Sequence, residues 1–224
     1  AIEQRRQQIE AEITKLEADL PQRFPVGEGD GPEESLRKQN LDNEFAAWLT
    51  EQQAKAVHWS VLRPSEMQTN LPRLEILADG SIFSSGDITK RDVFTLTFDL
   101  SSREHLVTAL RLEVLPDDRL PAGGPGRCYY EGRKGDFFLS EVTAKQGDAK
   151  VDITSASNSY GKISIGSGDA DAKNVLDGDG STGWSTSGRE GHASQLVLNF
   201  AKPLEPTGSL TIELLFERHF AASL

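Results

Sequence analysis

The first 56 residues have the apolar spacing of helices. Apolar side chains recur at intervals of seven, four and three residues, separated by Glu, Gln, Arg and Lys: Ile2, Ile9, Ile13, Leu16 and Leu20. Residues 21–33 are rich in Pro and Gly and end this helix. A second apolar stripe follows Leu36 and consists of Leu41, Phe45, Trp48, Leu49 and Ala56. The pattern predicts a helical hairpin over residues 1–56, with coiled-coil-like spacing.

From Trp59 onward the apolar period changes to two. Residues 93–98 and 108–115 alternate and are rich in β-branched and aromatic side chains, which predicts strands. Further predicted strands are Leu74–Leu77, Phe137–Thr143, Val151–Thr154, Gln195–Phe200 and Ser209–Phe216. Sheets with one apolar face must cover that face, so the fold class is mainly β, an antiparallel β-sandwich preceded by the helical hairpin.

Two parts of the β region resemble each other. An Asp-Gly-Ser turn and a Ser/Gly-rich link at 79–86 precede predicted strands at 94–100 and 106–115. The same order recurs at 179–188, 195–200 and 209–216. The similarity indicates either two small sandwiches in tandem, divided into 57–145 and 146–224, or the two halves of one sandwich. The alternative is a chance similarity between turn-rich segments.

Charge and composition exclude several partners. The chain has 24 Lys and Arg against 35 Asp and Glu, a net charge of −11, which repels nucleic acid and anionic lipid. With 20 Gly, 10 Pro and 37% hydrophobic residues, the composition is typical of a turn-rich soluble protein. No apolar run reaches the roughly 18 residues that span a bilayer. We therefore expect no nucleic-acid partner and no membrane insertion.

Cysteine content narrows the chemistry further. The single cysteine, Cys128, excludes an intramolecular disulfide, a CxxCH haem attachment and a Cys-rich zinc site. The chain starts at Ala1 without a signal peptide and stops at Leu224 just after an apolar strand. We interpret it as a segment of a longer protein whose targeting signals lie elsewhere.

The densest polar stretch is residues 169–184, in which Asp, Asn, Ser and Thr are mixed with Gly. Such a loop offers the carboxylate, hydroxyl and carbonyl oxygens that Ca²⁺ prefers. It is not an EF-hand, because Thr182 stands where Gly is needed and Gly188 where Glu is needed. The DxDG core is also found in aspartyl-phosphate phosphatases, but the α/β alternation of those enzymes is missing. The alternatives are a calcium loop and an Asp-Gly turn without an ion.

Residues 174–185, followed by 195–200, resemble the opening half of a discoidin, or coagulation-factor type C, module of the galactose-binding-like superfamily. In that family an A-x-D-G-D-x-x-T-x-W-x-S loop precedes a strand that ends in an Asp-Leu-Gly-type turn. This chain departs from the pattern with Asn-Phe-Ala-Lys at 199–202. The resemblance implies a jelly-roll sandwich in which Trp184 packs in the core.

The same resemblance implies a structural calcium ion in this loop. The ligands that carry over are the carbonyl of Asn174 and oxygens of Asp177, Asp179 and Thr182. A further Glu ligand of the family comes from a late strand, and the end of the chain at Leu224 is expected to have removed it.

A second resemblance covers most of the chain and is to a region of large planctomycete-type proteins with cytochrome-c-like haem domains and domains of unknown function. It is carried by residues 45–49, 59–66, 77–82, 88–97, 108–118, 120–121, 124–127 and 136–142. Those proteins are exported, and their association with polysaccharide degradation implies an extracytoplasmic module that binds carbohydrate. No haem motif lies in this chain, so electron transfer is not implied for it.

Catalysis has little support in the sequence. No GxSxG, Walker loop or SxxK is present, and no spacing rule selects a pair of carboxylates for glycoside hydrolysis. The histidines lack HxH or HExxH spacing: His58, His105, His192 and His219. We therefore expect this chain not to be an enzyme.

Sugar recognition needs an aromatic face for the pyranose C–H surface and polar side chains for its hydroxyls, usually on loops. Two loops have this chemistry. Residues 126–133 contain Arg127, Tyr129 and Tyr130, and residues 187–192 contain Arg189 and His192. For each loop the alternative is an ordinary solvated loop.

The sequence therefore favours a non-catalytic, extracytoplasmic module that binds polysaccharide or another glycan. The alternative, from a different class, is a structural or interaction module that binds no sugar. Such a module would contact other domains of a parent chain, or a second copy of itself, through residues 1–56.

Overall fold

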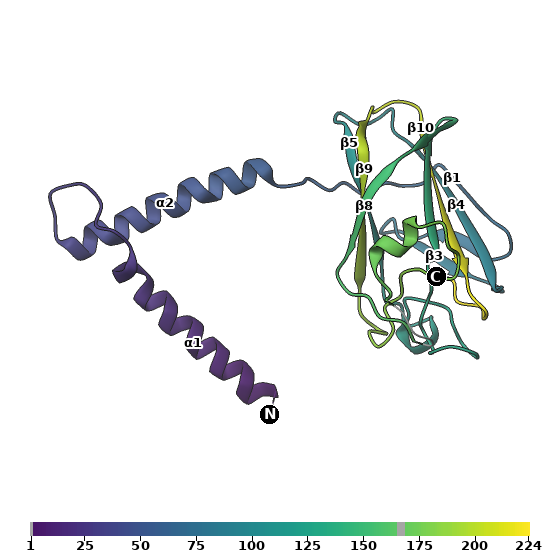
Figure 1. Cartoon of the computed structure of the whole chain (residues 1–224), viewed down its shortest axis with the longest axis horizontal. Helices are drawn as coiled ribbons and strands as arrows, with labels where there is room; N and C mark the ends of the chain where they lie inside the picture. The colour runs from purple at the N-terminus through teal and green to yellow at the C-terminus, as the bar shows by residue number, and fades with distance from the viewer. Residues whose placement is uncertain (1, 165–168) are drawn as a thin grey trace. The chain divides into compact units, whose positions relative to one another are not determined.

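The computed structural model describes residues 2–164 and 169–224. The chain consists of two compact units, Ala1–Ser60 and Val61–Leu224. The first unit is helical and the second is built from antiparallel sheets, so the protein is mainly β, as the sequence predicts (Figure 1).

The helical unit contains α1 (Ile2–Arg23) and α2 (Glu33–Lys55). Ion pairs between residues four apart support each helix locally: Arg6 with Glu10, Arg37 with Glu33, and Lys55 with Glu51. The acidic residues Glu33 and Glu34 in the first turn of α2 and Lys55 in its last turn also suit the helix dipole. Local interactions therefore account for both helices.

The apolar stripes of the two helices remain exposed. Side chains of both stripes are between 38% and 57% exposed, and no residue from 4 to 23 and none of α2 is buried: Ile9, Ile13, Leu16, Leu20, Phe45, Trp48 and Leu49. The helices form where the sequence predicts them and they contact each other, but that contact leaves these stripe residues exposed in the described part of the chain.

Neither helix resembles a membrane span. Over the described part of the chain, no helix combines the length and the apolar character needed to cross a bilayer.

The β unit is built on a five-stranded antiparallel sheet with the strand order β1-β4-β10-β6-β7. The strands are β1 (Glu66–Thr69), β4 (Arg91–Asp99), β6 (Glu141–Gln146), β7 (Ala149–Val151) and β10 (Ser209–Glu217). A three-stranded sheet has the order β5-β9-β8, with β5 (Val107–Val114), β8 (Ile153–Asn158) and β9 (Ser194–Leu204). A separate hairpin pairs β2 (Arg73–Ile76) with β3 (Ile82–Ser85).

One apolar core joins the two larger sheets. Every second residue of β4 and β10 is buried, as is every second residue of β9 as far as Phe200, because side chains alternate across a strand. The core residues come from both sheets and include Leu96, Leu198 and Leu214. This packing is consistent with a β-sandwich, and Figure 1 shows the sheets as two layers.

Strands from 57–145 and 146–224 alternate within the same sheets. Both belong to one compact unit, so the tandem alternative does not apply. The internal similarity corresponds to a pairing pattern: β4 and β5 in the first copy match β9 and β10 in the second, and β4 pairs with β10 while β5 pairs with β9. In this similarity β4 is equivalent to β9, and β5 is equivalent to β10. The pair β4–β10 is therefore equivalent to the pair β9–β5, as expected for two halves of one sandwich.

The strand boundaries differ from the prediction mainly where strands are short. The predicted strand 137–143 begins only at Glu141, because residues 137–140 bond to Trp184, Ala222 and Leu215 outside the regular ladder. The predicted strand 151–154 is the junction of β7 and β8. The pattern did not reveal β1 and β3, whereas β2, which is equally short, lies within one residue of the predicted strand Leu74–Leu77.

Candidate functional site

The loop between β5 and β6 presents two exposed tyrosines. Tyr129 is 48% and Tyr130 is 90% exposed, and their rings meet edge to face with centroids 4.7 Å apart. The ammonium of Lys134 lies 4.7 Å from the centroid of the Tyr129 ring, a cation–π contact. This loop, residues 126–134, is called the tyrosine loop below.

The base of the tyrosine loop is closely packed. Cys128 is fully buried and its backbone bonds to Asp136 and Gly135. Gly132 has no room for a side chain, because a Cβ there would lie 2.5 Å from the Cys128 sulfur and 2.5 Å from the Phe220 ring. Burial raises the pKa of the Cys128 thiol, so this residue behaves as a core side chain. The exposed tyrosines therefore project from a fixed support.

The second predicted loop, residues 187–192, lies against the first. Arg133 pairs with Glu190 at 2.6 Å, and the Gly191 amide donates to the Gly124 carbonyl at 2.9 Å. Burial alone would raise the pKa of Glu190, but hydrogen bonds from the Gly188 amide and Arg133 outweigh it and lower the pKa. The two loops that the sequence selected for sugar recognition thus meet at one end of the β unit.

The other predicted sugar residues are placed differently. Arg189 is exposed and its guanidinium stacks 4.4 Å above the Tyr160 ring, and His192 is exposed on the same loop. The Arg127 guanidinium is half-buried and donates to the Ser84 hydroxyl and the Gly86 carbonyl. Arg127 therefore fastens the tyrosine loop to the β2–β3 hairpin instead of lying beside the tyrosines.

The predicted calcium loop follows the 3-10 helix η2 (Ala172–Leu176) and is internally hydrogen-bonded. The Asp177 carboxylate accepts from the Asp179 amide and from the Thr182 hydroxyl, at 2.9 and 2.7 Å. The Asp179 carboxylate accepts from Ser181, and these hydrogen bonds lower its pKa. The Asn174 side chain donates to the Asp169 carbonyl at 2.7 Å. Asp79 and Ser81 form the same turn in the first half of the similarity.

Two glutamates from neighbouring strands approach this loop. One oxygen of Glu141, at the start of β6, is buried without a hydrogen-bond partner. Burial together with the adjacent Asp177 carboxylate raises the pKa of Glu141 to about 7. Glu217, at the end of β10, lies against Gly180 and forms an ion pair with Arg91. Although the sequence predicts that the late-strand Glu is missing, β10 brings a glutamate to the loop.

The donor set suits a hard cation in part. The Glu141 and Asp177 carboxyl groups interact with each other, and a divalent ion between them would neutralise the repulsion of the ionised pair. Among residues 2–164 and 169–224, however, no group of three or more His, Cys, Asp and Glu side chains is arranged to hold a metal. A calcium ion would draw its remaining ligands from carbonyl and hydroxyl oxygens of the loop.

Comparison of the chain with protein-family models, with curated proteins and with solved structures gave no match.

The sequence does not show how the two loops connect. Arg133 and Glu190 lie within the two loops proposed for sugar recognition, but their ion pair joins segments that are far apart in the chain, and no spacing indicates it. Glu141 has no signal in the sequence either, because its importance comes from the packing of β6 against the calcium loop.

Proposed function

We propose that this chain is a non-catalytic module that binds glycan, with the tyrosine loop as the contact surface. The observation that carries the proposal is the exposed Tyr129–Tyr130 pair, which stands on a closely packed base in the loop that the Arg133–Glu190 ion pair joins to residues 187–192.

The chemistry of this surface fits a sugar. An exposed tyrosine ring offers a flat apolar face for the C–H surface of a pyranose and has few rotatable bonds to immobilise. Arg189 and His192, on the adjoining loop, supply polar groups for hydroxyls. A 90% exposed aromatic ring such as Tyr130 contributes little to folding and is therefore available for contact with a ligand.

Affinity electrophoresis through gels containing soluble polysaccharides, together with pull-down on insoluble ones, tests this proposal. The wild-type chain is expected to be retained by at least one polysaccharide, and Tyr130→Ala to lose most of that retention. Leu106→Ala is the matched control, because Leu106 is an exposed apolar residue away from the loop. No retention on any polysaccharide, or equal retention of Tyr130→Ala, would refute the proposal.

We further propose that the loop of Asn174, Asp177, Asp179 and Thr182 binds a structural calcium ion, with Glu141 as an additional ligand. The support is the Glu141–Asp177 pair, whose mutual repulsion a divalent cation would relieve. Calcium is expected to raise the melting temperature, and both chelator and Asp177→Ala to remove that gain. A melt insensitive to calcium, to chelator and to Asp177→Ala would count against the ion.

The finer classification is also a proposal. Eight strands in two antiparallel sheets are what a jelly roll contains, and the core position of Trp184, which is fully buried, agrees with the discoidin-type resemblance. An extracytoplasmic location rests on the resemblance to exported planctomycete-type proteins alone. Protease accessibility of the parent protein in intact cells tests it.

One observation favours the alternative function, a structural or interaction module. The exposed stripes of α1 and α2 include the stacked rings of Phe45 and Trp48, whose centroids lie 5.7 Å apart. In this alternative the helices bind other domains of the parent chain or a second copy. Light scattering across a concentration series tests self-association, which Trp48→Ala is expected to weaken; the wild-type chain is then expected to show no polysaccharide retention.

A further inference from the structure

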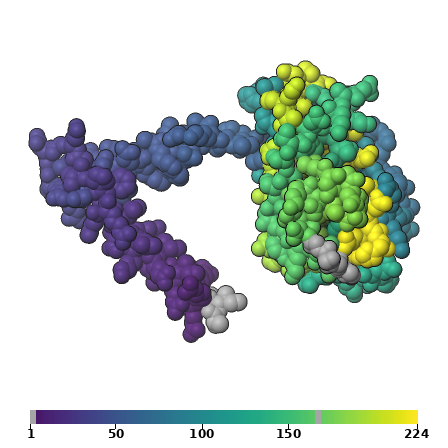
Figure 2. Space-filling model, in the orientation of Figure 1, coloured from purple at the N-terminus to yellow at the C-terminus, as the bar shows by residue number. Residues whose placement is uncertain are grey.

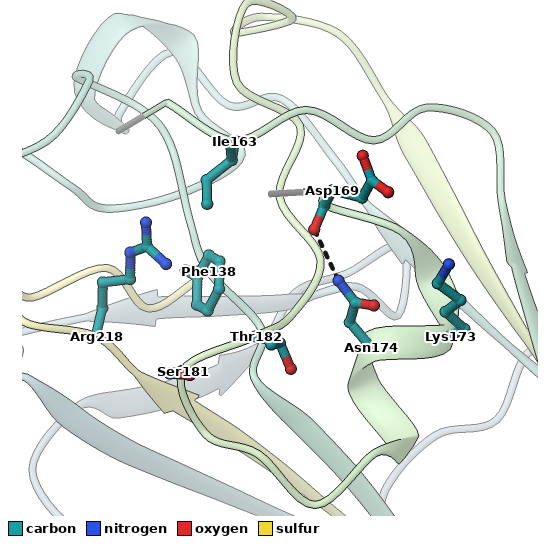
Figure 3. Close-up of a pocket in the computed structure, with 8 residues that line it drawn as sticks. All are labelled: Phe138, Ile163, Asp169, Lys173, Asn174, Ser181, Thr182 and Arg218. Carbon is teal, nitrogen blue, oxygen red and sulfur yellow. Dashed lines mark hydrogen bonds between the residues drawn. The ribbon is translucent and has the colours of Figure 1, made fainter. Parts of the chain in front are cut away.

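A cavity of about 310 Å³ lies beside the calcium loop. It is lined by Phe138, Ile163, Asp169, Lys173, Asn174, Ser181, Thr182 and Arg218. Figure 3 shows Phe138 and Arg218 on one side and Asp169, Lys173 and Asn174 on the other. Figure 2 shows the outer surface of this region, where the light green η2 segment lies beside the yellow C-terminal residues.

The cavity adjoins the proposed calcium loop without including its carboxylates. It shares Asn174 and Thr182 with the calcium loop, but the carboxylates of Asp177, Asp179 and Glu141 do not line it. The Arg218 guanidinium stacks 4.1 Å above the Phe138 ring, and burial lowers the pKa of Arg218. One wall of the cavity is therefore an aromatic ring covered by a guanidinium.

The hydrogen-bonding groups of the cavity are mixed. Lys173 and Arg218 are donors only, whereas the ionised Asp169 is an acceptor only. Ser181 and Thr182 donate their hydroxyl protons to Asp179 and Asp177, both at 2.7 Å, so they present lone pairs to the cavity as acceptors. Donors and acceptors thus line the same space.

This mixture discriminates between ligand classes. An inorganic anion would meet the Asp169 carboxylate and the lone pairs of two hydroxyls, and a cation would meet Lys173 and Arg218. A polyol satisfies both kinds of group, because each hydroxyl donates one hydrogen bond and accepts others. Ile163 adds apolar surface suited to C–H groups, whereas the Phe138 ring is buried and its face is covered by the Arg218 guanidinium.

We propose that this cavity binds a single neutral pyranose unit. Its volume lies at the lower end of the roughly 300–1,000 Å³ of small-molecule sites, which suits one sugar ring and not a longer chain. The inference rests on the proposed glycan-binding function and adds a second, more selective contact to the tyrosine loop.

Titration calorimetry with free sugars tests the cavity. The probes are glucose, galactose, mannose, fucose and N-acetylglucosamine, with sodium sulfate as the anion and glycerol as a small polyol. We expect at least one pyranose to bind, and Asp169→Ala and Lys173→Gln each to weaken it about tenfold, the loss of one charge-assisted hydrogen bond. The matched controls are Asp148→Ala and Lys150→Gln, exposed residues around the β6–β7 turn that do not line the cavity.

The outcomes separate this inference from the proposed function. Polysaccharide retention that depends on Tyr130, combined with no binding of any free pyranose, would overturn the cavity site and leave the tyrosine loop standing. Pyranose binding unchanged by both cavity variants would also overturn it, as would sulfate binding that Lys173→Gln abolishes. Absence of retention on every polysaccharide would instead refute the glycan-binding function.

Discussion

The helical unit and the β unit treat their apolar residues in opposite ways. In the helices, Leu16 is 57% and Trp48 is 53% exposed, whereas in the β unit Leu198 is 1% exposed and Trp184 is fully buried. Burial of an aliphatic side chain contributes about 1.5–3 kcal/mol, so the free energy of folding comes almost entirely from the β unit. The apolar residues of the helices are therefore available for contacts with another molecule or domain.

The same contrast holds for the way each unit fixes its conformation. The helices depend on ion pairs between neighbours on one face, which contribute only about 0.2–0.5 kcal/mol each. The β unit uses interlocked side chains, as where the Trp184 indole packs 5.1 Å from Phe137 and donates to the Tyr160 carbonyl. Only the packed side chains of the β unit can hold exposed loops in a fixed position.

The largest expected effect on the free energy of unfolding comes from replacing a leucine by alanine, a change that can be made in each unit. Leu198→Ala should lower the free energy of unfolding by about 2–5 kcal/mol, because it leaves a cavity in the core. Leu16→Ala should change it by less than about 0.5 kcal/mol. Urea denaturation of the full chain at low protein concentration measures both. Equal losses would show that the helical stripe is packed in solution.

A smaller effect is expected when a methyl group is added to a glycine. Gly132→Ala should cost about 1–3 kcal/mol, because its Cβ would overlap Cys128 and Phe220 at the base of the tyrosine loop. Gly31→Ala, in the connection between the helices, meets only Leu36 at ordinary contact distance and should be nearly neutral. Thermal melts compare the two variants, and a neutral Gly132→Ala would mean that the base of the loop is loosely packed.

The sequence predicts where helices and strands form better than it predicts which surfaces of them are covered. The strands at 93–98 and 209–216 show a clear alternation because one face of each is buried, and both were located within two residues. The exposure of the helical stripes could not be foreseen, since a spacing shows which side chains share a face and not whether anything covers that face.

The sequence predicted most of the exposed loop residues of the candidate site, but not the contacts that they make. Tyr129, Tyr130, Arg189 and His192 are exposed where the loop composition placed them, whereas Arg127 bonds to Ser84 and Gly86. The cavity could not be predicted, because Phe138, Lys173 and Arg218 come from three distant segments that only the packed fold brings together.

The pH dependence of stability tests the carboxyl pair of the β unit. The folded state raises the pKa of Glu141 from 4.5 to about 7, so it binds a proton more tightly than the unfolded chain does. Its stabilising contribution is complete below about pH 4.5 and is lost as the pH rises through about 7. The calcium-free protein should therefore become less stable between pH 5 and pH 8, as measured by melting temperature.

Glu141→Gln is the variant that isolates this effect. Burial also raises the pKa of Asp136, but this residue is present in both proteins and its contribution cancels in the comparison. Glu141→Gln should lose part of the pH dependence, and calcium should stabilise the wild type more at pH 8 than at pH 5.5. Identical pH profiles for the two proteins would contradict a repelling pair at Glu141 and Asp177.

The smallest effect on stability is expected for the aromatic residues of α2. Phe45→Ala and Trp48→Ala should each change the unfolding free energy by less than about 0.5 kcal/mol, since both side chains are more than half exposed. Denaturation measured below the concentration of any self-association checks this. A loss above 1 kcal/mol would show that the stacked pair supports the fold.

The most direct test of glycan binding is to locate a bound sugar on the full chain. A ¹⁵N-labelled sample titrated with an oligosaccharide of the retained polysaccharide reports the affected amides. The account predicts that the largest shifts fall in residues 126–134 and 187–192 and disappear in Tyr130→Ala. Shifts confined to the helices, or no shifts with any oligosaccharide, would contradict it.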